Sequence, residues 1–237
     1  MIDRVKLYIK YLIGREIYIP KQVSCNTKVL GNDGCSFPVA IDLLPKGRTI
    51  TVYSFGIGED LSFSEALLDM FKAEVYAFDP TPKAQRFVYS SVLIHKDNFH
   101  FYTYGLSDID GTEVFYLPEN NDYVSGSVLA RDGVDINNSI TVEMKKLSTI
   151  MKELSHDEID ILKMDIEGSE FKALPQIIES GCKFNQLCVE FHHRFIPGSG
   201  ADQLHNIIEL LNNHGYFVAA VGTSGEEVLF IKKNQTV

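Results

Sequence analysis

The sequence predicts an α/β protein built on one mostly parallel β-sheet that closes with an antiparallel hairpin. From residue 50 onward, strand-like and helix-like segments alternate, which is typical of a parallel sheet with helices on both faces. The last two strand-like segments follow one another without a helix between them, so they fit an antiparallel pair at a sheet edge. A length of 237 residues accommodates one such domain with a modest extension.

The elements follow from residue type and apolar spacing. The segments that resemble strands of the main sheet are residues 49–55, 74–79, 98–106, 159–165, 186–192, 215–222 and 226–233. Additional strands are predicted at 112–117 and 139–147, and helices at 64–72, 82–93, 169–179 and 201–213. Thr81 suits the N-cap of the second helix because Pro82 would then take its first position.

We expect two parts, an N-terminal helical extension at residues 1–35 and the principal domain at 36–237. The apolar residues of the extension recur at helical spacing and form one stripe: Ile2, Val5, Ile9, Leu12 and Ile13. This stripe would pack on the domain or on the partner in a homodimer, and contact with a membrane surface is the weaker alternative. Within the principal domain, residues 118–138 form a long insertion rich in turn formers, which we expect to be a lid over the substrate, with Tyr123 and Arg131 as contacts.

Composition excludes several kinds of partner. The net charge is −10 and no block of Lys and Arg occurs, so we expect no nucleic-acid partner. No apolar run approaches the roughly 18 residues that span a membrane, and charges interrupt the N-terminus where a signal peptide would be apolar. The cysteines lack CxxC spacing, which predicts reduced thiols in a cytoplasmic protein: Cys25, Cys35, Cys182 and Cys188.

A glycine loop follows the first strand of the main sheet. After Phe55 come Gly56 and Gly58, and then the carboxylates of Glu59 and Asp60. Glycine lets a backbone approach a ligand without a Cβ atom. A pyrophosphate would be repelled by the two acids, whereas S-adenosyl-L-methionine carries an ammonium and a sulfonium group and no phosphate. The loop therefore suits this cationic cofactor.

Asp79 ends the second strand, 21 residues after Gly58. An acid at this place can accept hydrogen bonds from both ribose hydroxyls of an adenosine cofactor. The other reading is a capping aspartate before Pro80. Since dinucleotide enzymes use the same acid, an NAD-dependent oxidoreductase is an alternative, although Leu61 stands where GxGxxG requires glycine.

Charged residues gather at the ends of two later strands. In "LKMDIEGSEFKAL", residues 162–174, alternation places Lys163, Asp165 and Glu167 on one side. Charges at the end of a buried strand must pair or bind something, so a bracing Lys163–Asp165 ion pair is the alternative to a ligand site. In "CVEFHHRF", Glu190 and His192 share a face, while the neighbouring His193 points the other way. Adjacent strands would bring Asp165, Glu190 and His192 together beyond the carboxyl ends of the sheet.

The motifs resemble the FkbM-type S-adenosylmethionine-dependent methyltransferases in order and spacing. The resemblance runs from about residue 31 to 233 and is carried by "TVYSFGIGEDLSFSEALL", "EVYAFDPTPKA", "YGLSDIDG", "LKMDIEGSEFKAL" and "VEFHHRF". It implies the seven-stranded Rossmann-like class I methyltransferase fold, with residues 36–237 as the catalytic domain. It also implies O-methylation of a hydroxyl on a sugar, glycan or related small molecule.

The resemblance further assigns cofactor contacts by position. The Gly56–Gly58 turn would hold the methionine part, Asp79 the ribose, and Gly105 with Leu106 would lie near the adenine. Asp165 would sit at the boundary between cofactor and acceptor. The sequence departs from the general loop at two places, since Ser54 replaces an acid and Asp60 replaces the usual third glycine.

For the chemistry, a neutral His192 is the predicted base, oriented by Glu190 or Asp165. A divalent metal held by Asp165, Glu190 and His192 is the alternative, but the spacing is not diagnostic of a metal and does not favour one. Besides the oxidoreductase, a catalytically silent protein that binds S-adenosylmethionine is a further alternative.

Overall fold

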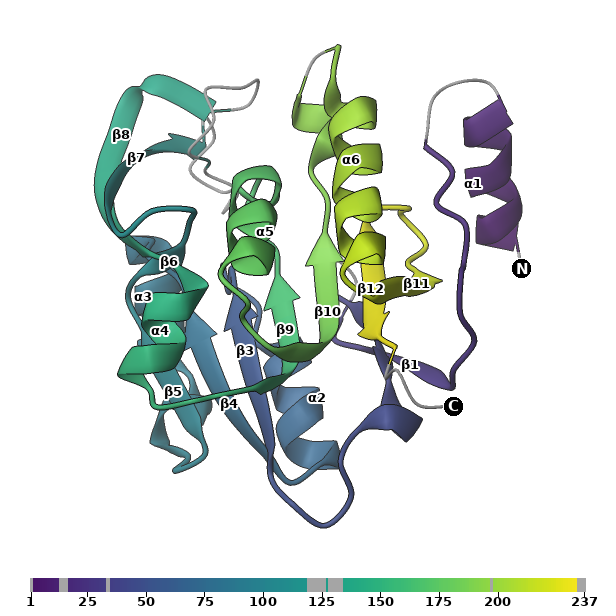
Figure 1. Cartoon of the computed structure of the whole chain (residues 1–237). Helices are drawn as coiled ribbons and strands as arrows, with labels where there is room; N and C mark the ends of the chain where they lie inside the picture. Colours follow the sequence, from purple (N-terminus) through teal and green to yellow (C-terminus); the bar gives the residue numbers. More distant parts are fainter. Residues whose placement is uncertain are drawn as a thin grey trace.

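A computed structural model describes residues 2–12, 17–32, 35–118, 127, 134–196 and 198–233. Within these residues the main sheet has seven strands in the order β11-β12-β10-β9-β3-β4-β5 (Figure 1). Their bounds are β3 Ile50–Phe55, β4 Ala73–Phe78, β5 Phe99–Tyr102, β9 Ile159–Met164, β10 Phe184–Glu190, β11 Tyr216–Val221 and β12 Glu227–Lys232.

Strand direction confirms the predicted fold class. β3 runs parallel to β4 and β9, β4 to β5, and β9 to β10. β12 is antiparallel to both of its neighbours, β10 and β11, so the hairpin closes the sheet as expected. The carboxyl ends of β3, β4, β9 and β10 therefore meet at one edge of the sheet, the upper edge in Figure 1.

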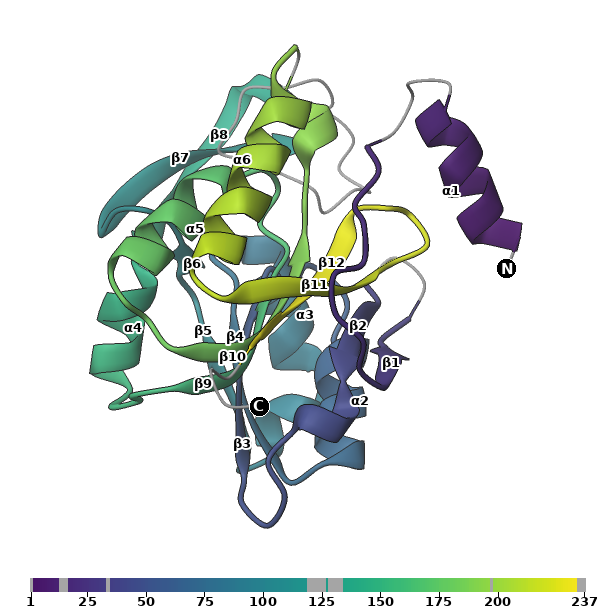
Figure 2. The same ribbon diagram turned by 45° about the vertical axis from the view of Figure 1, so that its right-hand side comes forward.

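Helices cover both faces of the sheet. α2 (Ser62–Met70) and α3 (Pro82–Ser90) lie on one face, and α4 (Leu147–Glu153), α5 (Glu170–Glu179) and α6 (Gly200–Asn213) on the other (Figures 1 and 2). The Thr81 hydroxyl accepts a hydrogen bond from the Ala84 amide, which confirms the predicted cap of α3. The sequence did not predict α4. Short 3₁₀ turns complete the helical elements: η1 Ile41–Leu43, η2 Val92–His95 and η3 His193–Phe195.

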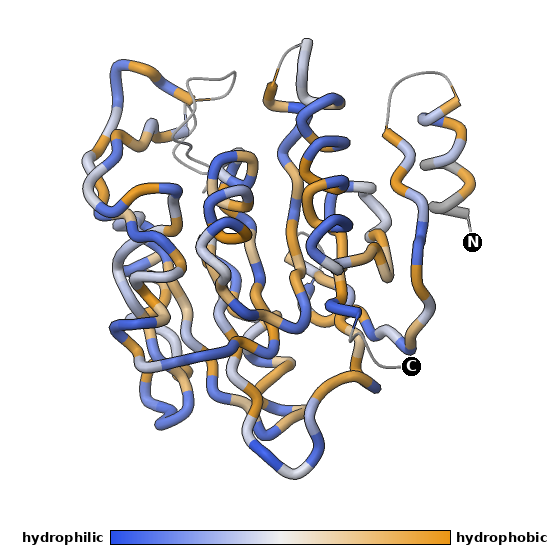
Figure 3. The backbone as a smooth tube through the Cα atoms, viewed as in Figure 1, coloured by the Kyte–Doolittle hydropathy of each residue, from blue (hydrophilic) through white to orange (hydrophobic). Residues whose placement is uncertain are grey.

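Alternation along β3 divides the core between the two faces. Ile50 and Val52 belong to the cluster beneath α2, whereas Tyr53 and Phe55 belong to the cluster beneath α4 and α5. All four side chains are buried. The strands consist mostly of hydrophobic residues, whereas hydrophilic and hydrophobic residues alternate along the outer helices (Figure 3). A strand that lies between two layers of helices is buried on both faces, and its sequence is therefore a nearly continuous apolar run.

A β-hairpin joins the N-terminal region to the domain. β1 (Thr27–Leu30) pairs antiparallel with β2 (Phe37–Ala40), and β2 is buried along its whole length. Gln186 on β10 exchanges two hydrogen bonds with the backbone of Ala40, which fixes the hairpin on the sheet. The expected boundary at residue 35 thus falls inside this hairpin. Within residues 1–35, helix is described only for α1 (Ile2–Leu12).

A small second sheet stands above the main one. β8 (Val134–Lys145) pairs with β6 (Gly105–Leu106) and, in an antiparallel register, with β7 (Gly111–Pro118). The insertion expected at 118–138 is shorter than predicted, because Pro118 ends β7 and residues 134–138 already belong to β8. Most of it, with Tyr123 and Arg131, lies outside the described residues. Ser127 is described: its hydroxyl donates to the Glu167 carbonyl at 2.6 Å, so the insertion contacts the segment that follows β9.

α1 lies at the side of the molecule (Figures 1 and 2), and its Tyr8 and Tyr11 line a pocket together with Ala220 and Val221 of β11. Its described apolar side chains are exposed: Val5, Tyr8, Ile9, Tyr11 and Leu12. A homodimer through this helix stays a prediction. Of the helices that the structure describes, none is both long and apolar enough to cross a membrane.

Candidate functional site

The glycine loop adopts a conformation that requires glycine. Gly56 and Gly58 have φ of +76° and +54°, in the left-handed region. A Cβ atom on Gly56 would lie 1.6 Å from the carbonyl oxygen of Asp165. The close approach at Gly56 is therefore to the protein's own backbone at the end of β9. The Phe55 side chain is buried and stacked on Phe78, so only its backbone faces the loop.

Asp79 anchors this loop. Its Oδ2 accepts the amides of Ile57 and Gly58, both at 2.9 Å. Its Oδ1 accepts the amide and the hydroxyl of Thr81, at 2.9 and 2.6 Å. A carboxylate has about four acceptor sites, so these bonds fill them. A ribose hydroxyl would have to share or replace one of these donors, and the ribose role of Asp79 stays a prediction.

We expect Asp79→Ala to lower the free energy of unfolding by about 2–3 kcal/mol even without cofactor, because buried amide donors lose a charged acceptor. Urea denaturation of the two proteins measures this difference. The matched control is Asp69→Ala, since Asp69 is exposed and only pairs with Lys96 at 3.7 Å. Equal stability of Asp79→Ala and the parent protein would contradict the anchoring role.

The two acids after the glycines have separate partners. Glu59 pairs with Lys83 of α3 at 3.1 Å and is partly exposed. Asp60 accepts a hydrogen bond at 2.7 Å from the amide of Ser62, the first residue of α2. Their predicted contact with the methionine ammonium group stays a prediction. Together with Asp165, they leave the loop bordered by carboxylates, as a cationic ligand requires.

Gly105 and Leu106 form β6, at the edge of the small sheet. A Cβ atom on Gly105 would meet the side chains of Met144 at 2.7 Å and Pro80 at 3.1 Å. Gly105 therefore lies next to the end of β4, as its predicted adenine role requires. The Leu106 side chain is fully buried in the core, so only its backbone remains for a ligand.

Lys163 joins the glycine loop to β9. Its side chain is 1% exposed, and Nζ donates to the carbonyl oxygens of Phe55 at 3.2 Å and Gly56 at 2.6 Å. Nζ also pairs with Asp165 Oδ2 at 3.3 Å, so the predicted ion pair is present. Burial by itself would lower the pKa of Lys163, but Asp165 and the other acids outweigh burial and raise it. The lysine thus remains charged and holds the two segments together.

Lys163→Met is expected to destabilise the protein by about 3–5 kcal/mol, because it leaves a partly buried carboxylate and two carbonyl groups without their cation. Thermal and urea unfolding measure the loss. Lys72→Met, at an exposed position, is the matched control. A loss below about 1 kcal/mol, the worth of a surface pair, would show that Asp165 and the carbonyls find other partners.

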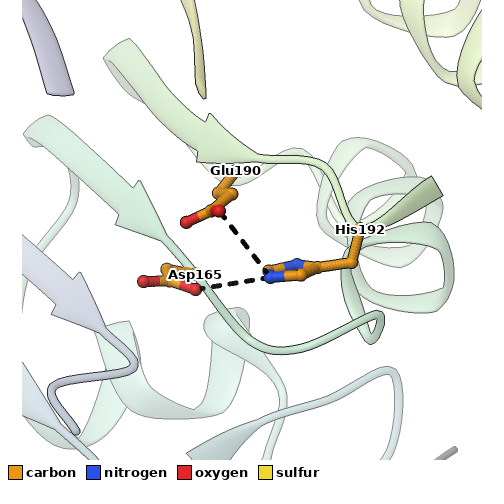
Figure 4. A group of neighbouring side chains, drawn as sticks. All are labelled: Asp165, Glu190 and His192. Carbon is orange, nitrogen blue, oxygen red and sulfur yellow. Dashed lines mark ion pairs between the residues drawn. The ribbon is translucent and has the colours of Figure 1, made fainter. Parts of the chain in front are cut away.

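The structure brings Asp165, Glu190 and His192 together, as predicted (Figure 4). One potential ligand atom from each lies within 4.8 Å of the other two. Strand alternation does not account for the position of His192 in the cluster, because β10 ends at Glu190 and His192 lies in the turn before η3. His193 lies elsewhere, with Nδ1 3.1 Å from the Phe191 carbonyl oxygen.

Glu170 orients the histidine, and the sequence analysis missed it. Glu170 Oε1 lies 2.9 Å from His192 Nδ1 and also accepts the amides of Ile166 and Gly168. Since a carboxylate accepts, Nδ1 carries the hydrogen and Nε2 turns to the other acids. A signal existed in the sequence: Glu170 shares the face of α5 that buries Ala173 and Leu174, where a charge needs a partner.

The surroundings of His192 in the chain alone favour its charged form over the neutral form predicted for the base. Burial would lower the pKa of His192, but the charge and hydrogen bond of Glu170, with Glu167 and Asp165, raise it to about 10. Burial and the charge of Asp165 likewise raise the pKa of the Glu190 carboxyl well above its ordinary value. The orienting acid is therefore Glu170, rather than Glu190 or Asp165 as predicted.

The strand order, the glycine loop after the first strand of the main sheet and the acids at the next strand ends define a seven-stranded class I methyltransferase. The model of the FkbM methyltransferase domain matches residues 47–218. The chain therefore belongs to the FkbM methyltransferase family, whose cofactor is S-adenosylmethionine. This membership decides against the NAD-dependent oxidoreductase.

Curated relatives are distant and longer. The human protein named "Probable methyltransferase-like protein 24" is 26% identical over 162 residues, which cover 66% of this chain and 37% of that protein. The "AMB antimetabolite synthetase AmbE" of Pseudomonas aeruginosa is 22% identical over 226 residues, covering 81% of this chain and 10% of that protein. The chain thus spans about a third or less of the length of these relatives.

Solved structures with a similar arrangement include two archaeal fibrillarins. That of Methanococcus jannaschii, a pre-rRNA processing protein, has a TM-score of 0.47 at 10% identity and covers 81% of this chain and 70% of its own. That of Aeropyrum pernix, with natively bound S-adenosyl-L-methionine, has a TM-score of 0.42 at 9% identity and covers 90% and 97%.

Proposed function

We propose that this protein transfers the methyl group of S-adenosylmethionine to a hydroxyl oxygen of a sugar, glycan or related small molecule. The observation that carries the proposal is the contact between the glycine loop and the cluster of Asp165, Glu190 and His192. Asp165 is 3.3 Å from the same Lys163 Nζ that binds the Gly56 carbonyl. The segment assigned to the methyl donor and the groups able to handle a hydroxyl proton are thus neighbours.

The residues fit the cofactor. The loop is held in its left-handed conformation by Asp79 in the chain alone, so a ligand meets a preformed backbone. Glu59, Asp60 and Asp165 place negative charge around it, which suits an ammonium and a sulfonium group and would repel a pyrophosphate.

The cofactor supplies a methyl group activated by the positive sulfur. In the transfer a bond forms between the acceptor oxygen and the methyl carbon, while the bond from carbon to sulfur breaks and its electron pair stays on sulfur. The hydroxyl proton must leave, and a group of the cluster in its deprotonated form must accept it. The chain's further task is alignment of oxygen, carbon and sulfur, which the loop and the strand ends fix relative to one another.

The test is a methyl-transfer screen with the full chain, S-adenosylmethionine and a panel of monosaccharides, glycans and small alcohols. Formation of S-adenosylhomocysteine together with a methylated acceptor supports the proposal. Tight S-adenosylhomocysteine binding without transfer to any hydroxyl acceptor would instead support the catalytically silent binding protein. Transfer only to nitrogen or carbon would overturn O-methylation and leave the methyltransferase class.

A further inference from the structure

The cluster surrounds one nitrogen of His192 with carboxylate oxygens. Asp165 Oδ1, Glu167 Oε2 and Glu190 Oε1 lie 3.8, 3.7 and 4.0 Å from Nε2. These separations are too long for hydrogen bonds. From Nε2 they are close to the roughly 3–4 Å between ligand atoms that each lie about 2.1 Å from one metal ion, and the atoms of Asp165, Glu190 and His192 all lie within 4.8 Å of one another. Figure 4 shows the side chains of three of these residues converging from β9, β10 and the turn that follows β10.

The imidazole is oriented so that Nε2 faces the space between these carboxylates. The His192 side chain is only 7% exposed, and Nε2 has no hydrogen bond among the contacts of the described residues. Glu170 holds Nδ1 at 2.9 Å. In many metal sites a histidine binds the metal through one ring nitrogen and donates the other ring N–H to a carboxylate, which fixes the tautomer. Glu170 is placed to be that carboxylate.

Charge and backbone conformation point the same way. The carboxyl groups around His192 outnumber the ammonium group of Lys163: Asp165, Glu167, Glu170 and Glu190. Glu167 has φ of +55°, which is strained for a residue with a side chain. Such strain persists at sites where a side chain must be aimed.

We propose that Asp165, Glu190 and His192, with Glu167 as a fourth ligand, bind one divalent cation of the Mg²⁺ or Mn²⁺ class. Three carboxylate oxygens and one imidazole nitrogen suit these hard cations, and no thiolate is present among the four. The functional consequence rests on the proposed methyl transfer: a hydroxyl bound to the cation would lose its proton more easily. Glu170 is then a positioning residue that acts through His192.

The test titrates the chelator-treated full chain with MnCl₂ and follows free Mn²⁺ by electron paramagnetic resonance. We expect one Mn²⁺ per chain, displaced by Mg²⁺. Asp165→Asn, Glu190→Gln and His192→Ala should each weaken Mn²⁺ affinity at least about 10-fold, and Glu170→Gln about 10–100-fold. The exposed controls on α6, His205→Ala and Glu209→Gln, should not change it. Thermal melting verifies that each variant is folded, and the isosteric Asn and Gln variants serve if His192→Ala unfolds.

Two results overturn the site: no stoichiometric Mn²⁺ binding by the parent chain, or equal Mn²⁺ affinity in the folded Asp165 and Glu190 variants. The assay of methyl transfer separates this inference from the proposed function. A methylated acceptor at full rate in excess chelator would remove the metal and keep the function. Stoichiometric Mn²⁺ binding without transfer to any hydroxyl would keep the metal and remove the function.

Discussion

Replacing His192 with alanine is expected to lower kcat of methyl transfer by about 10²–10⁴, the usual worth of a group placed to move a proton. The imidazole lies among the acids, because Asp165, Glu167 and Glu190 lie 3.7–4.0 Å from Nε2 and Glu170 lies 2.9 Å from Nδ1. Without the imidazole, the ring nitrogen that would bind a proton or a cation between the acids is lost. Turnover with a saturating acceptor measures the loss.

The donor side should be spared. S-adenosylhomocysteine affinity, measured by calorimetry, is expected to stay within about 3-fold in the His192 variant, since its side chain is not among the glycine-loop contacts. His193→Ala is the matched control: it is the neighbouring histidine and is also buried, yet lies outside the cluster. It should cost stability and keep kcat. Near-normal kcat in His192→Ala would exclude this residue from the reaction.

Gly56→Ala is expected to cause the largest stability loss of any alanine substitution in the loop. The added Cβ would lie 1.6 Å from the Asp165 carbonyl oxygen, a distance at which the end of β9 must move. Because that carbonyl directly follows β9 and belongs to a residue of the acid cluster, the shift disturbs both. We expect little folded protein at 25 °C, read from circular dichroism and the yield of monodisperse protein.

Gly47→Ala separates the clash from the backbone angle. Gly47 has φ of +86°, close to the +76° of Gly56, but its Cβ would meet nothing within 4 Å. That control should cost only the left-handed strain, about 1–2 kcal/mol. If the two variants lost the same stability, the approach to Asp165 would not matter.

The sequence was sufficient to predict the sheet and the proximity of Asp165, Glu190 and His192. Their strands are parallel neighbours, so the carboxyl ends had to meet at one edge. It was not sufficient for the detailed contacts of His192, because β10 ends two residues earlier and a 3₁₀ turn returns the ring to the cluster. Turn geometry of this kind depends on packing that periodicity does not record.

The missed elements have similar causes. α4 is only seven residues long and directly follows a strand, so its helical spacing is too short to stand out. The β1–β2 hairpin crosses the expected domain boundary because β2 is held by Gln186, a contact between residues far apart in sequence. The amide donors to Asp79 could not be predicted either, because they come from the turn of the loop it was expected to flank, and its ribose role stays a prediction.

The ammonium group of Lys163 has a thermodynamic consequence. It binds the carbonyl of Gly56, on the proposed donor side, and the carboxylate of Asp165, on the proposed acceptor side, so a shift of either partner changes the energy of the other. Any free energy by which the donor alters affinity at the acid cluster must then return equally as an effect of the cluster's ligand on the donor. Two equilibria that share one buried cation cannot be tuned independently, and selection on one of them acts on both.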